Sequence, residues 1–196
     1  MDMDNSYIKV ACIGDSITAG FGLEDWDDSY PNQLHYLLGN NYVVNPNLGK
    51  SGSSIWRHSL LPYIKTQEFI NAVHWPGDIL VVCLGTNDTV YQATEQFCRE
   101  FKEDYEDLLS FLLTTSPTAT AYLCKIPPIF RVENAQFAEN VTLINTLIAK
   151  VAESNGLPLI DLNTPLASSP DLLPDGLHPN EEGARIIAET VCDAIK

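Results

Sequence analysis

The chain has 196 residues, a length typical of one domain, and we predict a single domain over residues 1–196. Apolar residues make up 45% of it and charged residues 19%, a composition typical of globular proteins and not of disordered chains. A net charge of −15 would repel DNA, RNA and anionic membrane surfaces, so the composition argues against functions that bind nucleic acid or such membranes.

Five apolar segments are predicted to be strands. Four of them are almost continuously apolar and are bounded by Gly, Pro, Asp or Asn, which is typical of parallel strands covered on both faces. The fifth is short and gives a weaker pattern. In chain order the predicted strands are 8–13, 42–44 (the weak one), 79–84, 119–126 and 157–162.

Helical patterns lie between these strands. The first helix is expected to begin near Pro31, with Ser29 or Tyr30 at its entry, and to end at Gly39. Apolar residues at three- and four-residue spacing predict further helices over residues 97–112, 137–151 and 184–195. Asn180 is the expected N-cap of the last helix, because its side chain can accept from a free N–H of the first turn.

Strands that alternate with single helices form β-α-β units, which build a parallel sheet covered by helices on both faces. The chain also lacks repeats and linker-like segments. We therefore predict the α/β class, as one three-layer α/β/α domain. Ligands of such sheets bind beyond the carboxyl ends of the strands, so the segments that follow the strands are where chemistry is expected.

The chain ends and the cysteines bear on the cellular compartment. The first six residues are acidic and polar and do not resemble a secretory signal, and no stretch approaches the ~18 apolar residues of a membrane span. The odd number of cysteines and the lack of a C-x-x-C pair favour buried free thiols in a reducing cytosol over disulfides or zinc. We expect a cytoplasmic protein. The cysteines are Cys12, Cys83, Cys98, Cys124 and Cys192.

Polar residues with catalytic potential follow the predicted strands. Ser16 follows the first strand in the tripeptide Gly-Asp-Ser, and Gly49 follows the second. Asn87 follows the third strand in Gly-Thr-Asn-Asp, and a loop after the fifth strand carries Asp175 and His178. All of these residues are therefore expected at the one edge of the sheet where sites form.

These residue types suit acyl transfer. A serine hydroxyl needs a neighbouring base in order to attack a carbonyl carbon, and His178 is the natural base for Ser16. Asp175, three residues before His178, can fix the imidazole tautomer and stabilise the imidazolium. The backbone N–H groups of Gly49 and Ser16 and the side-chain amide of Asn87 can donate to the oxyanion of the tetrahedral intermediate.

Four segments together resemble the SGNH (GDSL) hydrolase family. Residues 14–17 match its G-D-S-[LI] block, and Gly49 within 47–52 matches its second block. Residues 85–88 match the G-x-N-D block, and 175–180 match the D-x-x-H block. One block alone would be weak, but the four occur in order over nearly the whole chain. The serine does not lie in a G-x-S-x-G elbow, so the α/β-hydrolase fold is a poorer match.

The resemblance implies a flavodoxin-like fold with a five-stranded parallel sheet, an open site and neither metal nor cofactor. It assigns Ser16 as the nucleophile, His178 as the base and Asp175 as the residue that orients the base. It also implies that Gly49, Asn87 and the Ser16 amide form the oxyanion hole. The expected substrate is a small-molecule ester, and the expected enzyme is a carboxylic-ester hydrolase.

Several other residues at this edge have simpler explanations. We interpret Asp15 as a residue that organises its loop and Asp88 as structural, since Asp175 has the better spacing to His178. Packing is the default for the other histidines, although Arg57 and His58 are candidates to line the cleft. Aromatic residues in the loops stack on a sugar ring or close the core, and the sequence leaves both open: they are Trp26, Trp56, Tyr91 and Phe130.

We therefore expect a serine-dependent esterase that acts through an acyl-enzyme on short acyl groups, with O-acetyl groups of carbohydrates as the preferred substrate. A lysophospholipase or thioesterase acting on longer chains is the alternative within the family. A metal-dependent phosphoesterase is the rival from another class, but it needs about four to seven protein ligands around its metal ions. A catalytically inactive binding module is a third reading. The sequence leaves the oligomeric state open.

Overall fold

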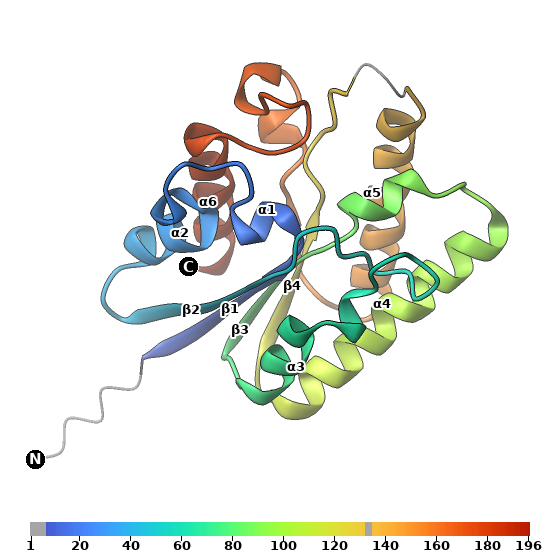
Figure 1. Cartoon of the computed structure of the whole chain (residues 1–196). Helices are drawn as coiled ribbons and strands as arrows, with labels where there is room; N and C mark the ends of the chain where they lie inside the picture. Colours follow the sequence, from blue (N-terminus) through green and yellow to red (C-terminus); the bar gives the residue numbers. More distant parts are fainter. Residues whose placement is uncertain (1–6, 132–134) are drawn as a thin grey trace, which may run out of the picture.

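The computed structural model describes residues 7–131 and 135–196. In these residues five strands form one parallel sheet, with the spatial order β2-β1-β3-β4-β5 (Figure 1). This order places β1 beside β3 at the centre of the sheet. The strands are β1 (Ile8–Gly14), β2 (Tyr42–Gly49), β3 (Ile79–Cys83), β4 (Thr120–Lys125) and β5 (Leu159–Asp161).

Helices cover both faces of this sheet. Short α1 (Ser16–Ala19) follows β1, and α2 (Tyr30–Leu38) and α6 (Glu181–Ile195) pack together on one face. The other face is covered by α3 (Gln67–His74), α4 (Glu95–Thr115) and α5 (Ala135–Ser154), as Figure 1 shows. The predicted three-layer α/β/α fold with a five-stranded parallel sheet is therefore confirmed.

Each central strand contributes to two hydrophobic cores. In β1, Ala11 and Ile13 face the core formed with α3, α4 and α5, whereas Val10 and Cys12 face the core formed with α2 and α6. Side chains of a strand alternate between the two faces of its sheet, and here both faces are covered by helices. This explains why the strands appear in the sequence as continuous apolar runs.

The strand predicted over 42–44 is longer in the structure. It continues to Gly49, and its pairing with β1 shifts from Val10 opposite Val44 to Cys12 opposite Asn47, so β2 contains one extra residue there. The extra residue falls at the Asn45–Pro46 dipeptide. Proline is tolerated in an edge strand at a bulge, but it interrupts the apolar pattern from which a strand is predicted.

Helix α3 was not predicted from the sequence. It has eight residues, begins after the N-cap Thr66, whose side chain accepts from Phe69 N (3.1 Å), and has Ala72 as its fully buried residue. The helix has only about two turns, so its apolar residues repeat too few times to stand out in the sequence. By contrast, Asn180 caps α6 as expected, because its Oδ1 accepts from Gly183 N (2.9 Å).

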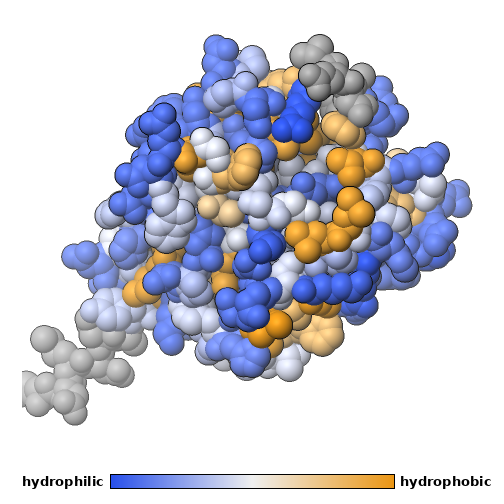
Figure 2. All heavy atoms as spheres, in the orientation of Figure 1, coloured by the Kyte–Doolittle hydropathy of each residue, from blue (hydrophilic) through white to orange (hydrophobic). Residues whose placement is uncertain are grey.

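The cysteines and the surface agree with the composition. All five thiols are free, and Cys98 is the partly exposed one. The face shown in Figure 2 is largely hydrophilic, with apolar side chains in separate groups. Over the described ranges, the helices are too short or too polar for any of them to pass through a bilayer.

Candidate active site

Ser16 lies where β1 turns sharply into α1. The Asp15 side chain caps α1 and accepts from Ile17 N (3.0 Å), and Ser16 is the first residue of the helix and is buried. Gly14 permits the close return of the chain, since a Cβ there would lie 1.9 Å from Thr18 Oγ1. The tripeptide Gly-Asp-Ser therefore presents the Ser16 hydroxyl at the carboxyl edge of the sheet.

The loop before α6 brings His178 and Asp175 to the same point. Asp175 Oδ1 accepts the backbone N–H groups of Leu177 (2.9 Å) and His178 (2.7 Å). Its Oδ2 lies 2.7 Å from His178 Nδ1, and His178 Nε2 lies 2.9 Å from Ser16 Oγ. Residues 162 positions apart in the chain are thus joined in one hydrogen-bonded series.

The partners determine the tautomer of the imidazole. The pKa of Asp175 lies well below its usual range: burial raises it, but the His178 backbone N–H, the His178 ring and the Leu177 N–H together lower it further. An ionised carboxylate only accepts hydrogen bonds, so Nδ1 carries the proton toward Asp175. Nε2 of the neutral ring is then free to accept the Ser16 hydroxyl proton.

Asp15 is a second carboxylate beside this series, with a different environment. Burial raises its pKa to about 6, although the Ile17 N–H, the neighbouring Thr86 and the charge of His178 lower it in part. Its Oδ1 is engaged by the α1 cap. Asp15 thus has the contacts of a residue that organises the turn, in line with its interpretation from the sequence.

The three predicted oxyanion donors lie where β1, β2 and β3 end, at the carboxyl edge of the sheet. Asn87 Nδ2 donates to Ser53 O (2.8 Å), which leaves its second amide hydrogen available. The Ser16 N–H is in the first turn of α1, where N–H groups have no partner within the helix. Gly49 N donates to Asn47 Oδ1 (2.9 Å), so this N–H is already engaged. A Cβ at Gly49 would lie 2.2 Å from Ala19 N, so glycine is also required there by the approach of α1.

Asp88 holds the loop after β2. Its Oδ2 accepts from Ile55 N and its Oδ1 from Trp56 N, each at 2.9 Å, and the side chain is fully buried. Burial raises its pKa to about 7, and the two backbone N–H groups offset only part of that rise. These contacts fit the structural role expected for Asp88.

The aromatic residues named from the sequence divide into two kinds. Trp56 and Tyr91 pack on each other with ring centroids 4.9 Å apart and on Phe97 of α4, so they close the core. Phe130 packs partly buried against the core beside α6. Trp26 differs, because it is 57% exposed and lines a surface groove.

Arg57 and His58 face α4. The guanidinium of Arg57 forms ion pairs with Asp104 (3.3 Å) and Asp107 (2.7 Å), and His58 Nε2 lies 4.0 Å from Glu100 Oε2. Arg57 fastens the loop after β2 to this helix and the exposed His58 lies beside it, so the structure does not support their placement in the cleft.

The remaining two histidines lie on helices. His35 is on α2 and lines the groove beside Trp26, and His74 is the last residue of α3, where its Nδ1 lies 2.7 Å from Ile70 O. Packing and surface positions are what the sequence indicated for both. Over the described residues, no group of three or more His, Cys, Asp and Glu side chains could hold a metal ion.

Two residues at the site were not singled out by sequence reasoning. The Phe21 ring lies 4.7 Å from the His178 ring, and Arg131 contacts Asp175 (Nη2 to Oδ2, 3.3 Å). Each belongs to a loop outside the four sequence blocks. Their contacts span 157 and 44 positions along the chain, and no short-range pattern reports such pairs.

Comparison with known proteins identifies relatives of this chain and proteins of the same fold. An acetylxylan esterase from Xylanibacter ruminicola is 31% identical over 212 aligned residues, which cover 96% of this chain. The chain spans only 43% of that relative's length. A carbohydrate acetylesterase from Sinorhizobium meliloti has the same fold, with a TM-score of 0.73 at 18% identity over 95% of this chain and 97% of the other.

An aryl esterase from M. smegmatis also shares the fold, with a TM-score of 0.69 at 20% identity over 96% of this chain and 100% of the other. The model of the GDSL-like lipase/acylhydrolase family matches residues 12–186, which include every block quoted from the sequence. The chain therefore belongs to the GDSL-like lipase/acylhydrolase family, as the four sequence blocks predicted.

Proposed function

We propose that this chain hydrolyses carboxylic esters through a covalent acyl-enzyme on Ser16. The observation that carries the proposal is the continuous series from Ser16 Oγ through the His178 ring to Asp175, with separations of 2.9 and 2.7 Å. A hydroxyl hydrogen-bonded to a neutral imidazole, itself oriented by an ionised carboxylate, is the arrangement that activates a serine.

The reaction follows from this geometry in two stages. Ser16 Oγ forms a bond to the ester carbonyl carbon while its proton passes to His178 Nε2, and Asp175 stabilises the imidazolium. The tetrahedral intermediate collapses as the C–O bond to the alcohol breaks, and the imidazolium protonates the leaving oxygen. A water molecule then attacks the acyl-enzyme by the same route and releases the acid.

Donors for the oxyanion come from two sources in this proposal. The free hydrogen of Asn87 Nδ2 and the Ser16 N–H donate to the developing negative charge. The Gly49 N–H joins them when it is shared with, or released from, Asn47 Oδ1. Residues 1–196 act as one catalytic domain, since the residues of the site come from positions 16 to 178.

Acetyl esters of carbohydrates are the proposed substrate class. The 31% identical relative is an acetylxylan esterase, and one protein of the same fold is a carbohydrate acetylesterase. The lining of a groove beside the edge strand β2 includes asparagine amides that can bond sugar hydroxyls, and the exposed Trp26 is available for stacking on a sugar ring. The lining residues are Trp26, Asn32, His35, Val43, Val44, Asn45 and Asn47.

Four residues of β2 line this groove, and one of them lies near a proposed oxyanion donor. Asn47 lines it and lies two residues before Gly49, a separation of about 7 Å along a strand. The net charge of −15 disfavours anionic substrates such as phospholipids and acyl-CoA. A neutral sugar bound beside Trp26 would not be repelled by this charge.

The chemistry is tested with p-nitrophenyl esters from acetate to palmitate, in the presence and absence of a chelator. We expect acetate to be the best substrate, the chelator to have no effect, and Ser16→Ala to abolish the activity. Ser110→Ala, an exposed serine on α4, is the matched control and keeps it. Chelator-sensitive activity that survives Ser16→Ala would establish the metal-dependent alternative, and a preference for palmitate would establish the lysophospholipase or thioesterase alternative.

The carbohydrate is tested separately, on acetylated xylan and p-nitrophenyl acetate in parallel. Trp26→Ala should raise KM for acetylated xylan and leave the small ester unaffected. Tyr36→Ala serves as the control, because Tyr36 is an exposed aromatic residue on α2 that does not line the groove. Equal kinetics of the Trp26 variant and wild type on the polymer would remove the groove from the proposal.

A further inference from the structure

Arg131 makes two contacts with the residue proposed to orient the base. Its Nη2 lies 3.3 Å from Asp175 Oδ2, and its Nε donates to the Asp175 backbone carbonyl at 3.3 Å. Oδ2 is also the atom that lies 2.7 Å from His178 Nδ1. One carboxylate oxygen is therefore shared between the imidazole and a guanidinium.

The backbone around Arg131 is fitted to the same turn. Phe130 N donates to Gly176 O (2.8 Å), next to Asp175. Gly176 has φ of +75°, and a Cβ there would lie 3.0 Å from Arg131 N and 3.1 Å from Arg131 Cγ. Glycine thus meets two requirements at this position, a left-handed backbone and room for the neighbouring segment.

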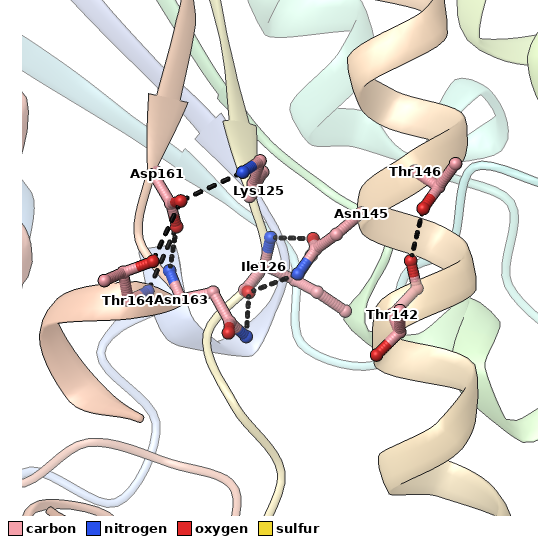
Figure 3. A network of polar contacts seen from close by, with 8 residues as sticks. All are labelled: Lys125, Ile126, Thr142, Asn145, Thr146, Asp161, Asn163 and Thr164. Carbon is pink, nitrogen blue, oxygen red and sulfur yellow. Dashed lines mark hydrogen bonds and ion pairs between the residues drawn. The ribbon is translucent and has the colours of Figure 1, made fainter. Parts of the chain in front are cut away.

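The segment that carries Arg131 leaves β4 in a fixed direction. Ile126 N donates to Asn145 Oδ1 (2.7 Å), and Ile126 O accepts from Asn145 Nδ2 (3.2 Å) and Asn163 Nδ2 (3.1 Å), as Figure 3 shows. The next two residues are Pro127 and Pro128, whose rings restrict the backbone further. Residues 126–131 are therefore held at both ends, by a buried asparagine of α5 at one and by the Asp175 turn at the other.

The second asparagine of this network is itself oriented. Asp161 Oδ1 accepts from Asn163 N (2.9 Å) and Thr164 N (3.0 Å), and Asp161 Oδ2 forms an ion pair with Lys125 Nζ at 2.9 Å (Figure 3). The network thus ties the exits of β4 and β5 together. Its geometry is transmitted to the site through the short segment 126–131.

From these contacts we propose that residues 126–131 form a positioning arm, and that Arg131 is a positioning residue which holds the Asp175 carboxylate and offsets part of its charge toward the His178 imidazole. The proposal rests on the proposed function, because it assigns Arg131 a role toward the base of that reaction. Asp175 receives two backbone N–H groups on Oδ1 and the imidazole and guanidinium on Oδ2, so its orientation is fully determined.

The electrostatic part follows from the sign of the charges. An imidazolium is stabilised by Asp175, and a guanidinium on the same carboxylate offsets part of that attraction. Facing the ring in the described part of the chain are Asp175, Ser16, the neutral Phe21 and, by its charge, Asp15, while Arg131 supplies the cation on Asp175. Removal of the guanidinium therefore strengthens the net attraction of this carboxylate for an imidazolium.

The test compares Arg131→Gln and Arg131→Lys with wild type, using kcat/KM for p-nitrophenyl acetate from pH 4.5 to 9 and the Tm of each variant. For Arg131→Gln we expect the acid limb of the profile to move up by about half a pH unit, the size of a lost, partly exposed charge. The plateau should also fall about 3- to 10-fold, since the carboxylate is less well oriented.

Arg131→Lys separates charge from geometry. Lysine keeps the cation, so the acid limb should stay at the wild-type pH, but a point charge cannot hold the carbonyl and the carboxylate together, so the plateau should still fall. Arg185→Gln removes an arginine with two carboxylate partners, Glu182 and Glu189, from the surface of α6 and is the matched control. It should leave both limb and plateau unchanged.

Two results would overturn the proposal. An acid limb of Arg131→Gln at the wild-type pH would show that Arg131 does not act on the base, and a plateau loss that only follows a lower Tm would reduce the arm to a stabilising contact. Ser16→Ala in the same assay distinguishes the two levels of inference. If Ser16→Ala retains activity the proposed function fails, whereas if it is inactive and Arg131→Gln equals Arg185→Gln, only the arm is refuted.

Discussion

Two carboxylates near the site, Asp88 after β3 and Asp175 before α6, have opposite electrostatic environments. Asp88 is fully buried, and burial raises its pKa to about 7 despite hydrogen bonds from two backbone N–H groups. The Asp175 side chain is 45% exposed; burial still raises its pKa, but donors from His178 and Leu177 lower it well below the usual range. A carboxylate stays ionised where hydrogen-bond donors and solvent stabilise its charge, whereas burial favours its protonated form.

The two environments suit two different roles in the proposed site, with Asp88 as a structural support and Asp175 as a partner of the base. A residue that stabilises an imidazolium must be charged over the working pH range, and the environment of Asp175 meets that condition. Asp88 uses both of its oxygens to hold the loop that contains Ser53, whose carbonyl in turn anchors Asn87. In the proposed reaction, the buried Asp88 region therefore supports the oxyanion donor, and the exposed Asp175 region assists the proton transfer.

The strongest test of this comparison exchanges the two carboxylates for amides. Asp175→Asn should lower kcat/KM by about 1000- to 10000-fold, because an amide can present a donor to Nδ1 and favour the wrong tautomer. Its Tm should change little, since the side chain is partly exposed. If Asp88→Asn showed the larger kinetic loss per folded molecule and Asp175→Asn the smaller, the roles assigned to the two residues would be reversed.

The next largest effect is expected at Asn87, the proposed oxyanion donor that the loop held by Asp88 anchors. Asn87→Ala should lower kcat by about 100- to 1000-fold with a smaller change in KM, because its amide acts on charge that develops only in the transition state. Asn155→Ala, at the end of α5, is the control and should be kinetically silent. A change confined to KM in the Asn87 variant would mean that this amide binds the ground state instead.

The loss of unfolding free energy should be larger for Asp88→Asn than for Asp175→Asn, the reverse of the order expected for kcat/KM. Asp88→Asn turns one accepting oxygen into a donor that faces a backbone N–H, which leaves buried groups unpaired and should cost about 1–3 kcal/mol of unfolding free energy. Urea unfolding of Asp88→Asn and Asp175→Asn measures the two losses side by side. A loss no larger for Asp88→Asn than for Asp175→Asn would argue against the supporting role of the buried carboxylate.

The smallest effect is the pH dependence of stability. The folded pKa of Asp15 is about 6 and that of Asp88 about 7, both above the ordinary 3.8, so between pH 4 and 7 the folded state binds more protons than the unfolded state. Stability from these two groups is therefore highest at low pH and is lost as the pH rises through 6 to 7.

Asp88→Asn removes one of the two contributions and should flatten the fall of unfolding free energy from pH 5 to 8 by about 1–3 kcal/mol. Parallel slopes for wild type and the variant would show that the folded state does not hold Asp88 at a raised pKa. Asp175, whose pKa is lowered, acts in the opposite direction and only below about pH 4.

Much of this protein could be predicted from local sequence. The apolar runs predicted the strands and the α/β class because both sheet faces are covered, and the polar residues after them marked the functional edge. The four blocks led to the family, which the family match confirms. Each of these signals lies within a few consecutive residues, where spacing alone carries the information.

Other features depended on contacts between distant segments. The extension of β2 through Pro46 requires β1 as a partner, and the opposite environments of Asp88 and Asp175 follow from what packs around each. The contact of Arg131 with Asp175 joins two loops 44 residues apart. Sequence patterns report periodicity and turn chemistry, whereas burial, shared hydrogen bonds and charge neighbours exist only once the sheet has brought those loops together.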